Sequence, residues 1–365
     1  MHIEKKKANS TEFEKIAAAD SVAVIQGIGA TFMQNLKVTI NGNEVYNSNC
    51  LQSYKSYLEM LLSYPDDAMS SHMQMVGWFS ETTLDDPKDN GFLKRKKLMA
   101  DGKQQFITRI FSDVCQIPQY MVNHVNMTLE IQPQRDNFCL QAYDEGEYRL
   151  VIDSIKLYVK TITLNDGVAV GFANSLLRNP AIYPMKRTEM KSFYIGAGRS
   201  ETNISLFQDQ IPTKVILGLV PHANFQSNSK LSPFKFSNGD LRSVTLSANG
   251  QLHPHVDFDM DFKNNKYLKA YHQLQETLNY AFSKESNTIC RSKFKTDFCL
   301  FAFNLTSDLE EDEESFDLIK KGSTTLNLKF NSVVPENGYV LIVYAQFQNL
   351  LLIDNMRNVS TDITA

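Results

Sequence analysis

One stretch of the sequence occurs twice in relaxed form, and this duplication constrains the fold more than any other feature. The first copy, residues 36–64, reads LKVTINGNEVYNSNCLQSYKSYLEMLLSY. The second copy, residues 244–282, reads VTLSANGQLHPHVDFDMDFKNNKYLKAYHQLQETLNYAF. Each copy begins with an alternating strand, closes it with Asn-Gly and then opens an amphipathic helix around Tyr-Leu. Self-similarity over this distance predicts one structural module used twice.

Length and composition suit a globular protein with two modules. The chain has 365 residues, and a typical domain holds about 100–200. Hydrophobic residues make up 42% and charged residues 21%, and the net charge of -4 excludes a global basic field, so we expect no sequence-specific nucleic-acid partner. The sequence lacks a secretion signal and any run of about 18 apolar residues, which predicts an intracellular protein without a membrane partner. The five irregularly spaced cysteines predict buried thiols.

Alternating patterns predict further strands around both copies. In the first half they fall at residues 36–40, 106–114, 124–131, 137–143 and 148–164. In the second half they fall at residues 185–196, 202–207, 213–220, 244–248, 298–306, 323–330 and 338–354. The connections between strands of the first half are too short for helices, which favours antiparallel sheets. The simplest architecture is all-β, with two similar sandwiches that each carry an inserted helix.

A stretch rich in turn residues predicts where the two halves meet. We expect a first sandwich over residues 1–165, a joint over 166–183 and a second sandwich over 184–365. Fewer residues precede Val38 than separate the joint from Val244, so the first sandwich is expected to lack its opening strands. Residues 1–20 are polar and predict a helical or disordered lead-in.

The strongest candidate for chemistry is the run HPHVDFDMD at residues 253–261. On an extended chain its two histidines and three aspartates share one face, and these ligands suit a divalent metal. A metal-dependent, cupin-like enzyme would use His253, His255 and Asp259, with Asp259 in the place of the cupin glutamate. The alternative is an ordinary half-buried strand with one wet face, which alternation of this kind favours. On that interpretation the chain has no metal site and no cofactor.

Other motifs do not predict an enzyme. The glycine pairs at Gly27 and Gly196 do not complete a nucleotide-binding loop, and no nucleophile motif or P-loop is present. The basic run Lys94–Lys97 is either a nuclear-import or phosphate-contact signal or a solvated loop, and the solvated loop is favoured. The acidic run Asp308–Glu314 predicts an exposed loop.

Three stretches carry a family resemblance: residues 34–64, residues 183–236 and YLKAYHQL at 267–274. They resemble the major capsid proteins of Polinton/Maverick elements and adintoviruses, which belong to the adenovirus hexon-like lineage, over most of the chain. The resemblance implies a double jelly roll, three copies of which form a pseudo-hexagonal capsomer in an icosahedral shell. It implies no catalytic residues and no small-molecule substrate.

We therefore expect a structural protein of the virion capsid that forms homotrimers and contacts neighbouring capsomers or the penton protein, in the cytoplasm or nucleus of the host cell. The family has further strands before the equivalent of Ser21, so this chain is expected to be a truncated genomic copy or to lack an exon. The competing interpretations are the metal-dependent enzyme and a carbohydrate-binding β-sandwich.

Overall fold

A computed structural model of the chain describes residues 1–7, 10–306 and 319–361. The described strands form five sheets, and all named strand pairs are antiparallel. The acidic run Asp308–Glu314 lies outside the described residues. No helix in the described part of the chain has the length and apolar character needed to cross a bilayer.

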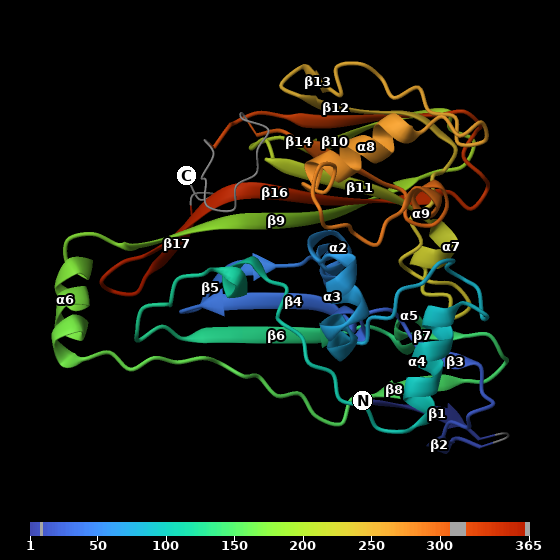
Figure 1. Ribbon diagram of the computed structural model, residues 1–365. Coiled ribbons are helices and arrows are strands. Elements are labelled where there is room, and N and C mark those ends of the chain that lie inside the picture. Colours follow the sequence, from blue (N-terminus) through green and yellow to red (C-terminus); the bar gives the residue numbers. More distant parts are fainter. Residues whose placement is uncertain (8–9, 307–318, 362–365) are drawn as a thin grey trace.

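The C-terminal half is a two-layer β-sandwich, drawn in the upper part of Figure 1. One sheet has the order β10-β15-β12-β13, and the other has the order β14-β11-β16-β17 with β9 along β16. The strands are β9 Ala181–Ile195, β10 Glu201–Phe207, β11 Lys214–Pro221, β12 Leu241–Ala248, β13 Gln251–His253, β14 Leu300–Asn304, β15 Thr324–Phe330, β16 Tyr339–Ile353 and β17 Val359–Thr361. Phe236, Phe294, Phe303 and Phe347 are fully buried in its core. The strands predicted for this half are present.

The N-terminal half is divided into smaller sheets beneath that sandwich (Figure 1). Their orders are β5-β4-β6, β3-β7 and β2-β1-β8. The strands are β1 His2–Lys6, β2 Phe13–Lys15, β3 Val22–Val24, β4 Met33–Ile40, β5 Asn43–Asn47, β6 Met127–Pro133, β7 Leu140–Ala142 and β8 Tyr148–Val151. The prediction of a helical or disordered lead-in was wrong, because β1 and β2 pair with each other and β1 pairs with β8.

Helices lie between the sheets and at the periphery of the fold. The α-helices are α1 Ile28–Thr31, α2 Gln52–Ser63, α3 Asp66–Ser70, α4 Asn90–Ala100, α5 Asp136–Cys139, α6 Asp166–Leu176, α7 His222–Phe225, α8 Leu268–Thr277 and α9 Arg291–Lys295, and the 3₁₀ helices are η1 His72–Val76 and η2 Asp113–Gln116. Helix α6 stands at the far end of a long arm, well away from the sandwich (Figure 1). It occupies most of the predicted joint, where turn residues had indicated a linker or corner.

The duplicated strand, Asn-Gly turn and helix are present in both halves. Strand β4 pairs with β5 and β6 in the same way that β12 pairs with β13 and β15. At the turns, Asn41 and Gly42 have φ of 49° and 84°, and Asn249 and Gly250 have φ of 48° and 82°. Successive positive φ values are what a tight type I′ hairpin requires, and Asn-Gly adopts them at little cost. Helices α2 and α8 then follow at matching places.

The start of α2 differs from the prediction. Ser48 or Asn49 had been expected to cap the helix, but its N-cap is Leu51, which makes no side-chain capping bond. The Ser48 hydroxyl instead accepts a 2.9 Å hydrogen bond from the Leu36 amide and donates a 2.8 Å bond to Asn35. Ser48 therefore fastens the hairpin rather than the helix. The helix ends just before Pro65, as predicted.

Three predicted strands of the first half are absent or short. Residues 106–112 form no strand, and of residues 148–164 only the four residues of β8 pair. The strand predicted at 137–143 begins with the short helix α5 and pairs only at β7. Alternation makes a strand possible, but a strand needs a neighbour for its backbone hydrogen bonds.

The cysteine prediction was right at two of five positions. Cys139 and Cys299 are buried, whereas Cys50, Cys115 and Cys290 are exposed. Cys50 lies in the left-handed turn before α2, with φ of 62°, and Cys290 is the N-cap of α9. Turns and helix starts lie at the surface because their backbone groups need solvent or capping partners.

Candidate functional site

The predicted metal ligands do not form a metal centre. Strand β13 ends at His253, so the predicted strand over 253–261 stops at its first residue. The rings of His253 and His255 lie 5.6 Å apart between centroids. Partial burial and the neighbouring His255 lower the pKa of His253.

Asp259 is committed to other partners. Its carboxylate pairs with Lys266 and lies 3.4 Å from Arg242, and hydrogen bonding to these cations lowers its pKa. Among residues 1–7, 10–306 and 319–361, no group of three His, Cys, Asp or Glu side chains could hold a metal. The alternation of apolar and polar residues in this run nevertheless reflects packing, because the apolar members Phe258, Met260 and Phe262 are buried. The metal-dependent enzyme has no support from this arrangement.

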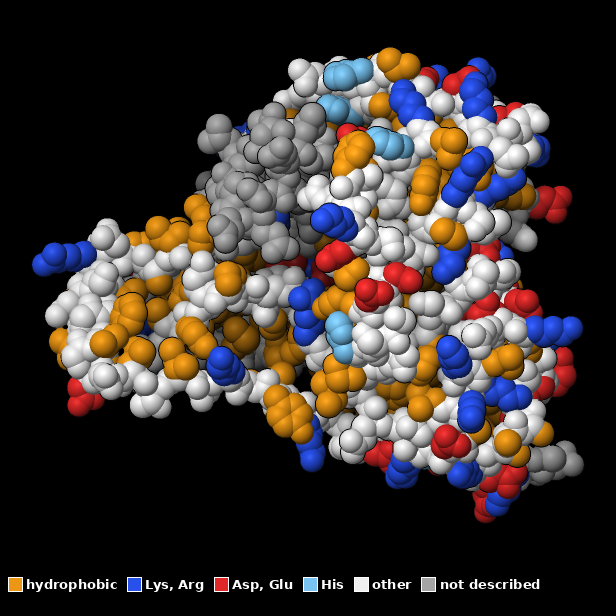
Figure 2. Space-filling view, in the orientation of Figure 1, with side chains coloured by type: hydrophobic (Ala, Val, Ile, Leu, Met, Phe, Trp, Pro, Cys, Tyr) orange, Lys and Arg blue, Asp and Glu red, His pale blue; other side chains and the backbone are white. Residues whose placement is uncertain are grey.

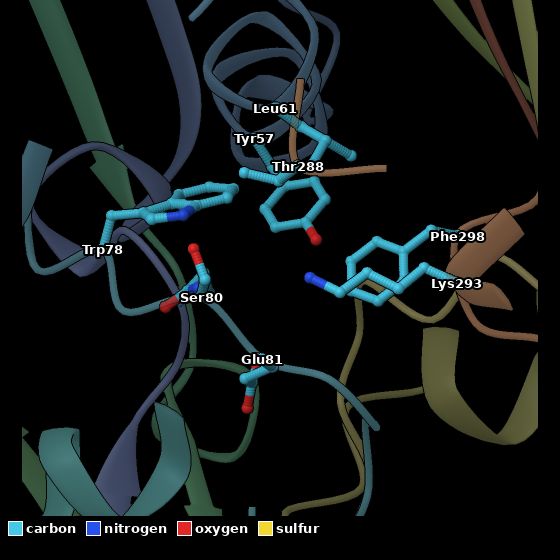
Figure 3. Close-up of a pocket in the computed structure, with 9 residues that line it drawn as sticks. Tyr57, Leu61, Trp78, Ser80, Glu81, Thr288, Lys293 and Phe298 are labelled. Atoms are coloured by element: carbon cyan, nitrogen blue, oxygen red, sulfur yellow. The ribbon is translucent and has the colours of Figure 1, made fainter. Parts of the chain in front are cut away.

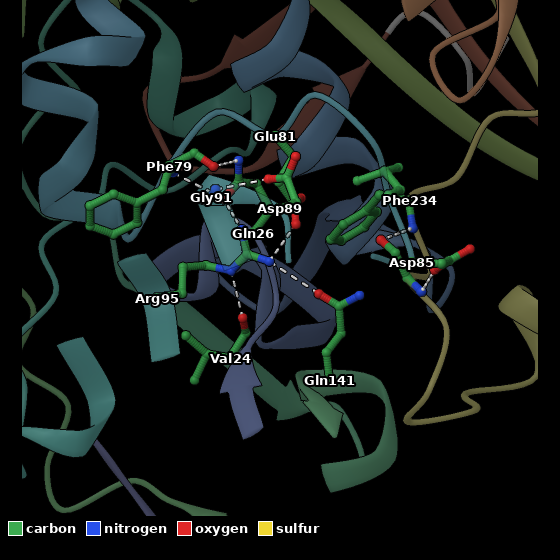
Figure 4. A network of polar contacts seen from close by, with 12 residues as sticks. Val24, Gln26, Phe79, Glu81, Asp85, Asp89, Gly91, Arg95, Gln141 and Phe234 are labelled. Atoms are coloured by element: carbon green, nitrogen blue, oxygen red, sulfur yellow. Dashed lines mark hydrogen bonds and ion pairs between the residues drawn. The ribbon is translucent and has the colours of Figure 1, made fainter. Parts of the chain in front are cut away.

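The basic run at 94–97 lies on helix α4 and not in a loop. Arg95 is fully buried and donates to four acceptors, which Figure 4 shows converging on its guanidinium. The acceptors are the Val24 carbonyl at 2.8 Å, Gln26 at 3.0 Å, Glu81 at 2.7 Å and Gln141 at 3.1 Å. Arg95 thus ties α4 to β3 and β7. The prediction of a wholly solvated run was wrong, because this one side chain turns inward on the helix.

A carboxylate of the first half holds a loop of the second half. Asp85 accepts hydrogen bonds from the Ser232 amide at 2.5 Å, the Asn224 side chain at 3.3 Å and the Lys235 ammonium at 3.0 Å. Figure 4 shows Asp85 beside Phe234. In the opposite direction, Asp297 accepts from the amide of Leu84 at 3.0 Å. Sequence reasoning missed these residues, since lone aspartates in turns carry no signal of a distant partner.

Helix α2 inserts aromatic rings into the same contact. Tyr57 stacks on Phe234 with ring centroids 4.0 Å apart and an interplanar angle of 7°. The Tyr54 hydroxyl donates to the Pro233 carbonyl at 2.9 Å. Stacked, buried aromatic pairs add about 0.5–1.5 kcal/mol beyond the area they bury. The organising helix of the first copy is therefore also an apolar link to the second half.

A buried ionic cluster forms a third link. Lys55 is fully buried on α2, 2.5 Å from Asp113 and 3.6 Å from Glu59. Asp113 accepts from the Thr188 amide on β9 at 2.7 Å, and Tyr344 on β16 donates to Glu59 at 3.5 Å. Burial opposes the charge of Lys55, but Asp113 and the other groups around it raise its pKa well above the ordinary value. Burial raises the pKa of Glu59, and the neighbouring Asp113 carboxylate also raises it, whereas the Lys55 ammonium lowers it.

A small pocket lies where the halves meet, and Figure 3 shows Tyr57 and Trp78 on one side of it and Lys293 with Phe298 on the other. Its free volume of about 10 Å³ admits about one water molecule. The Trp78 indole nitrogen is buried without a hydrogen-bond partner among the described residues, and a water in this pocket would serve it. The pocket is too small for a substrate.

The most exposed apolar surface is the projecting arm, residues 152–180. No residue of α6 is buried, and Val168, Val170 and Phe172 are 48%, 59% and 55% exposed. Figure 2 shows apolar side chains gathered on this arm, at the left of the molecule. A large contiguous apolar patch on a protein surface marks an interaction site. The sequence signal was the apolar stretch GVAVGFANSL, which the neighbouring turn residues obscured.

Comparisons with known proteins identify the architecture. No established family profile matches the sequence. An uncharacterized protein of Caenorhabditis elegans, F54H12.2, is 29% identical over 346 residues, which are 93% of this chain and 82% of that protein. The PBCV-1 VP54 structure fitted into the virophage Sputnik superposes with a TM-score of 0.54 at 11% identity and covers 99% of this chain and 87% of its own.

The mavirus major capsid protein superposes with a TM-score of 0.52 at 10% identity, over 99% of this chain and 81% of its own. The chain has the double jelly-roll fold. This confirms the prediction of an all-β fold with two tandem sandwiches and inserted helices. Within the double jelly roll, the links around Asp85, Tyr57 and Lys55 join the two halves. None of these links involves the arm at residues 152–180, whose apolar side chains stay exposed.

Proposed function

We propose that this double jelly-roll protein is a structural subunit of a viral capsid, a hexon-type major capsid protein of the kind found in Polinton/Maverick elements. The observation that carries the proposal is the superposition on the mavirus major capsid protein over 99% of the chain. Its natural location is the virion capsid, and its role is structural rather than enzymatic.

Duplication gives a physical reason for such a role. Two similar sandwiches in one chain give a trimer six similar edges, so that a three-fold object can occupy a nearly six-fold position in a shell. We divide the chain into a first jelly roll at 1–165, a joint at 166–183 and a second jelly roll at 184–365. The buried links between the halves support their action as one rigid tile.

The helix of the arm is the surface we assign to contacts between subunits. Helix α6 has apolar side chains and no buried residue. A neighbouring subunit that covers this helix would stabilise the contact by about 25 cal/mol for each Å² of apolar surface removed from water. Partners are the other two copies of a homotrimer and the neighbouring capsomers.

Native mass measurement of the purified chain tests the proposal. We expect a trimer without bound metal, and a Val170→Asp variant that is monomeric because the charge would have to be buried in the contact. Leu268→Asp is the matched control, since Leu268 on α8 is 48% exposed but lies off the arm. A monomeric wild-type chain with stoichiometric metal contradicts the proposal.

A further inference from the structure

We propose that residues 152–164, the acceptor segment, bind an extended β-strand of a separate polypeptide. The inference rests on local geometry and is independent of the proposed capsid function. The segment follows β8 directly and runs to the start of α6. Within the described residues it belongs to no strand and its backbone makes no hydrogen bond to another element. It nevertheless remains close to extended over most of its length (Figure 1).

The second half of the molecule provides an internal template for the missing partner. Residues 148–164 correspond in order to β16, which has partners on both edges. Strand β9 follows β16 antiparallel over its whole length, from Tyr339 opposite Ile195 to Ile353 opposite Ala181. The acceptor segment has the alternating sequence of such a strand and lacks both neighbours.

A partial ladder already leads to the acceptor segment. Strand β1 pairs antiparallel with β8, from Lys5 opposite Tyr148 to His2 opposite Val151. The pairing therefore stops where the acceptor segment begins. A strand placed in line with β1 would lie beside the acceptor segment, and its backbone could pair with the free amides and carbonyls of that segment. Strand β9 pairs with β16 in this way. Strand addition of this kind uses main-chain hydrogen bonds for affinity.

The side chains of the acceptor segment define the chemistry of its occupant. Every residue from 153 to 164 is exposed, and the exposed apolar members are Ile155, Leu157, Tyr158, Val159, Ile162 and Leu164. Lys156 and Lys160 pair with no carboxylate among the described residues, whereas Asp153 is paired with Lys103. The occupant is thus an extended segment that alternates apolar residues with acidic or hydroxyl residues, because opposite charges across a ladder attract.

Hydrogen exchange with a synthetic peptide tests this assignment on the whole chain. The probe matches the acceptor segment in length and alternates Val or Ile with Glu or Thr. We expect the amides of residues 154–164 to exchange freely in the protein alone and about tenfold or more slowly with saturating peptide. A peptide with Lys in place of Glu should bind more weakly. No protection of the acceptor segment at saturation overturns the proposal.

Variants at one position separate backbone pairing from simple apolar contact. Val159→Pro removes one amide donor and should weaken peptide binding by about tenfold or more, while Val159→Thr keeps the donor and the β-branched shape and should retain binding. Because Val159 is unpaired in the free chain, both variants should fold normally. Equal binding by the two variants overturns the proposal. Protection that rises with protein concentration alone, without peptide, also overturns it, because a second copy is then the occupant.

Discussion

Strands β6 and β15 hold equivalent places in the two halves, yet side chains at matching positions are exposed on β6 and buried on β15. Met127 and Ile131 on β6 are 38% and 36% exposed, whereas Thr324 and Leu328 at the matching positions of β15 are 0% and 1% exposed. Strand β15 lies between β10 and β12, and β6 pairs only with β4 in the described chain. Burial of a strand is therefore a property of its neighbours as much as of its own sequence.

The same contrast separates β16 from residues 148–164. Strand β16 lies in the middle of its sheet, and its apolar side chains are part of the main core. Residues 148–164 have a comparable pattern but pair only over β8. The second half is a continuous two-layer sandwich, whereas the first half is divided into small sheets, and the buried Arg95 cluster joins α4 to two strands of that half.

The first prediction concerns the polar support of the N-terminal half. Arg95→Ala should lower the free energy of unfolding by about 3–5 kcal/mol, because it leaves the buried Glu81 carboxylate unpaired. Lys94→Ala, next to it on the exposed face of α4, should change it by less than about 0.5 kcal/mol. Urea unfolding of both variants checks this. Similar values for the two would mean that the Arg95 cluster does not support the half.

The second prediction compares a paired strand with its unpaired counterpart. Val343→Pro in β16 should destabilise the fold by about 3 kcal/mol, since Val343 lies between Leu217 and Lys191 on adjacent strands. Val159→Pro should cost less than about 0.5 kcal/mol. Thermal unfolding of the two variants at equal concentration provides the measurement. A large loss of stability in Val159→Pro would show that the segment is paired in solution.

The third prediction sets one buried leucine against its exposed equivalent. Leu328→Ala should lower the free energy of unfolding by about 3 kcal/mol through lost burial and a cavity, and Ile131→Ala by about 1 kcal/mol. Denaturant midpoints of the two variants give the difference. The comparison between β6 and β15 fails if both substitutions have the same cost.

The smallest expected effect is electrostatic and concerns the cluster that joins the halves. Burial raises the pKa of Glu59 above its ordinary value of 4.5, so the folded state binds its proton more tightly than the unfolded state. The resulting stability is present below the unfolded pKa and is lost as the pH rises through the folded pKa. Glu59→Gln should remove this dependence and raise the free energy of unfolding at pH 7, because the buried amide carries no charge for burial to oppose.

Stability of the wild type and of Glu59→Gln, measured at several pH values, checks this. Parallel pH profiles for the two proteins would show that Glu59 does not titrate differently on folding. Glu44→Gln is a suitable control, because Glu44 lies at the surface of β5 beside Lys37 and its pKa is lowered rather than raised.

Much of the second half could be predicted from residues alone. Its strands pair along nearly their whole length, so the alternating pattern and the observed elements coincide. In the first half the same reasoning predicted strands at 106–114 and 148–164 that do not form as expected. The candidate site was less predictable still. The histidines at 253 and 255 were conspicuous but form no metal-binding group with other described residues, whereas Asp85, Arg95 and the arm gave weak signals.

Features that depend on near neighbours along the chain follow from the residues alone. The Asn-Gly turns need positive φ, Pro65 ends α2, and the repeated pattern implies two modules of one kind. Which alternating stretch becomes a paired strand, which cation of the basic run is buried and which apolar helix stays exposed all depend on the folded chain. The physical reason is that hydrogen-bond partners and exclusion of water come from residues far away in the chain, and a local pattern does not specify them.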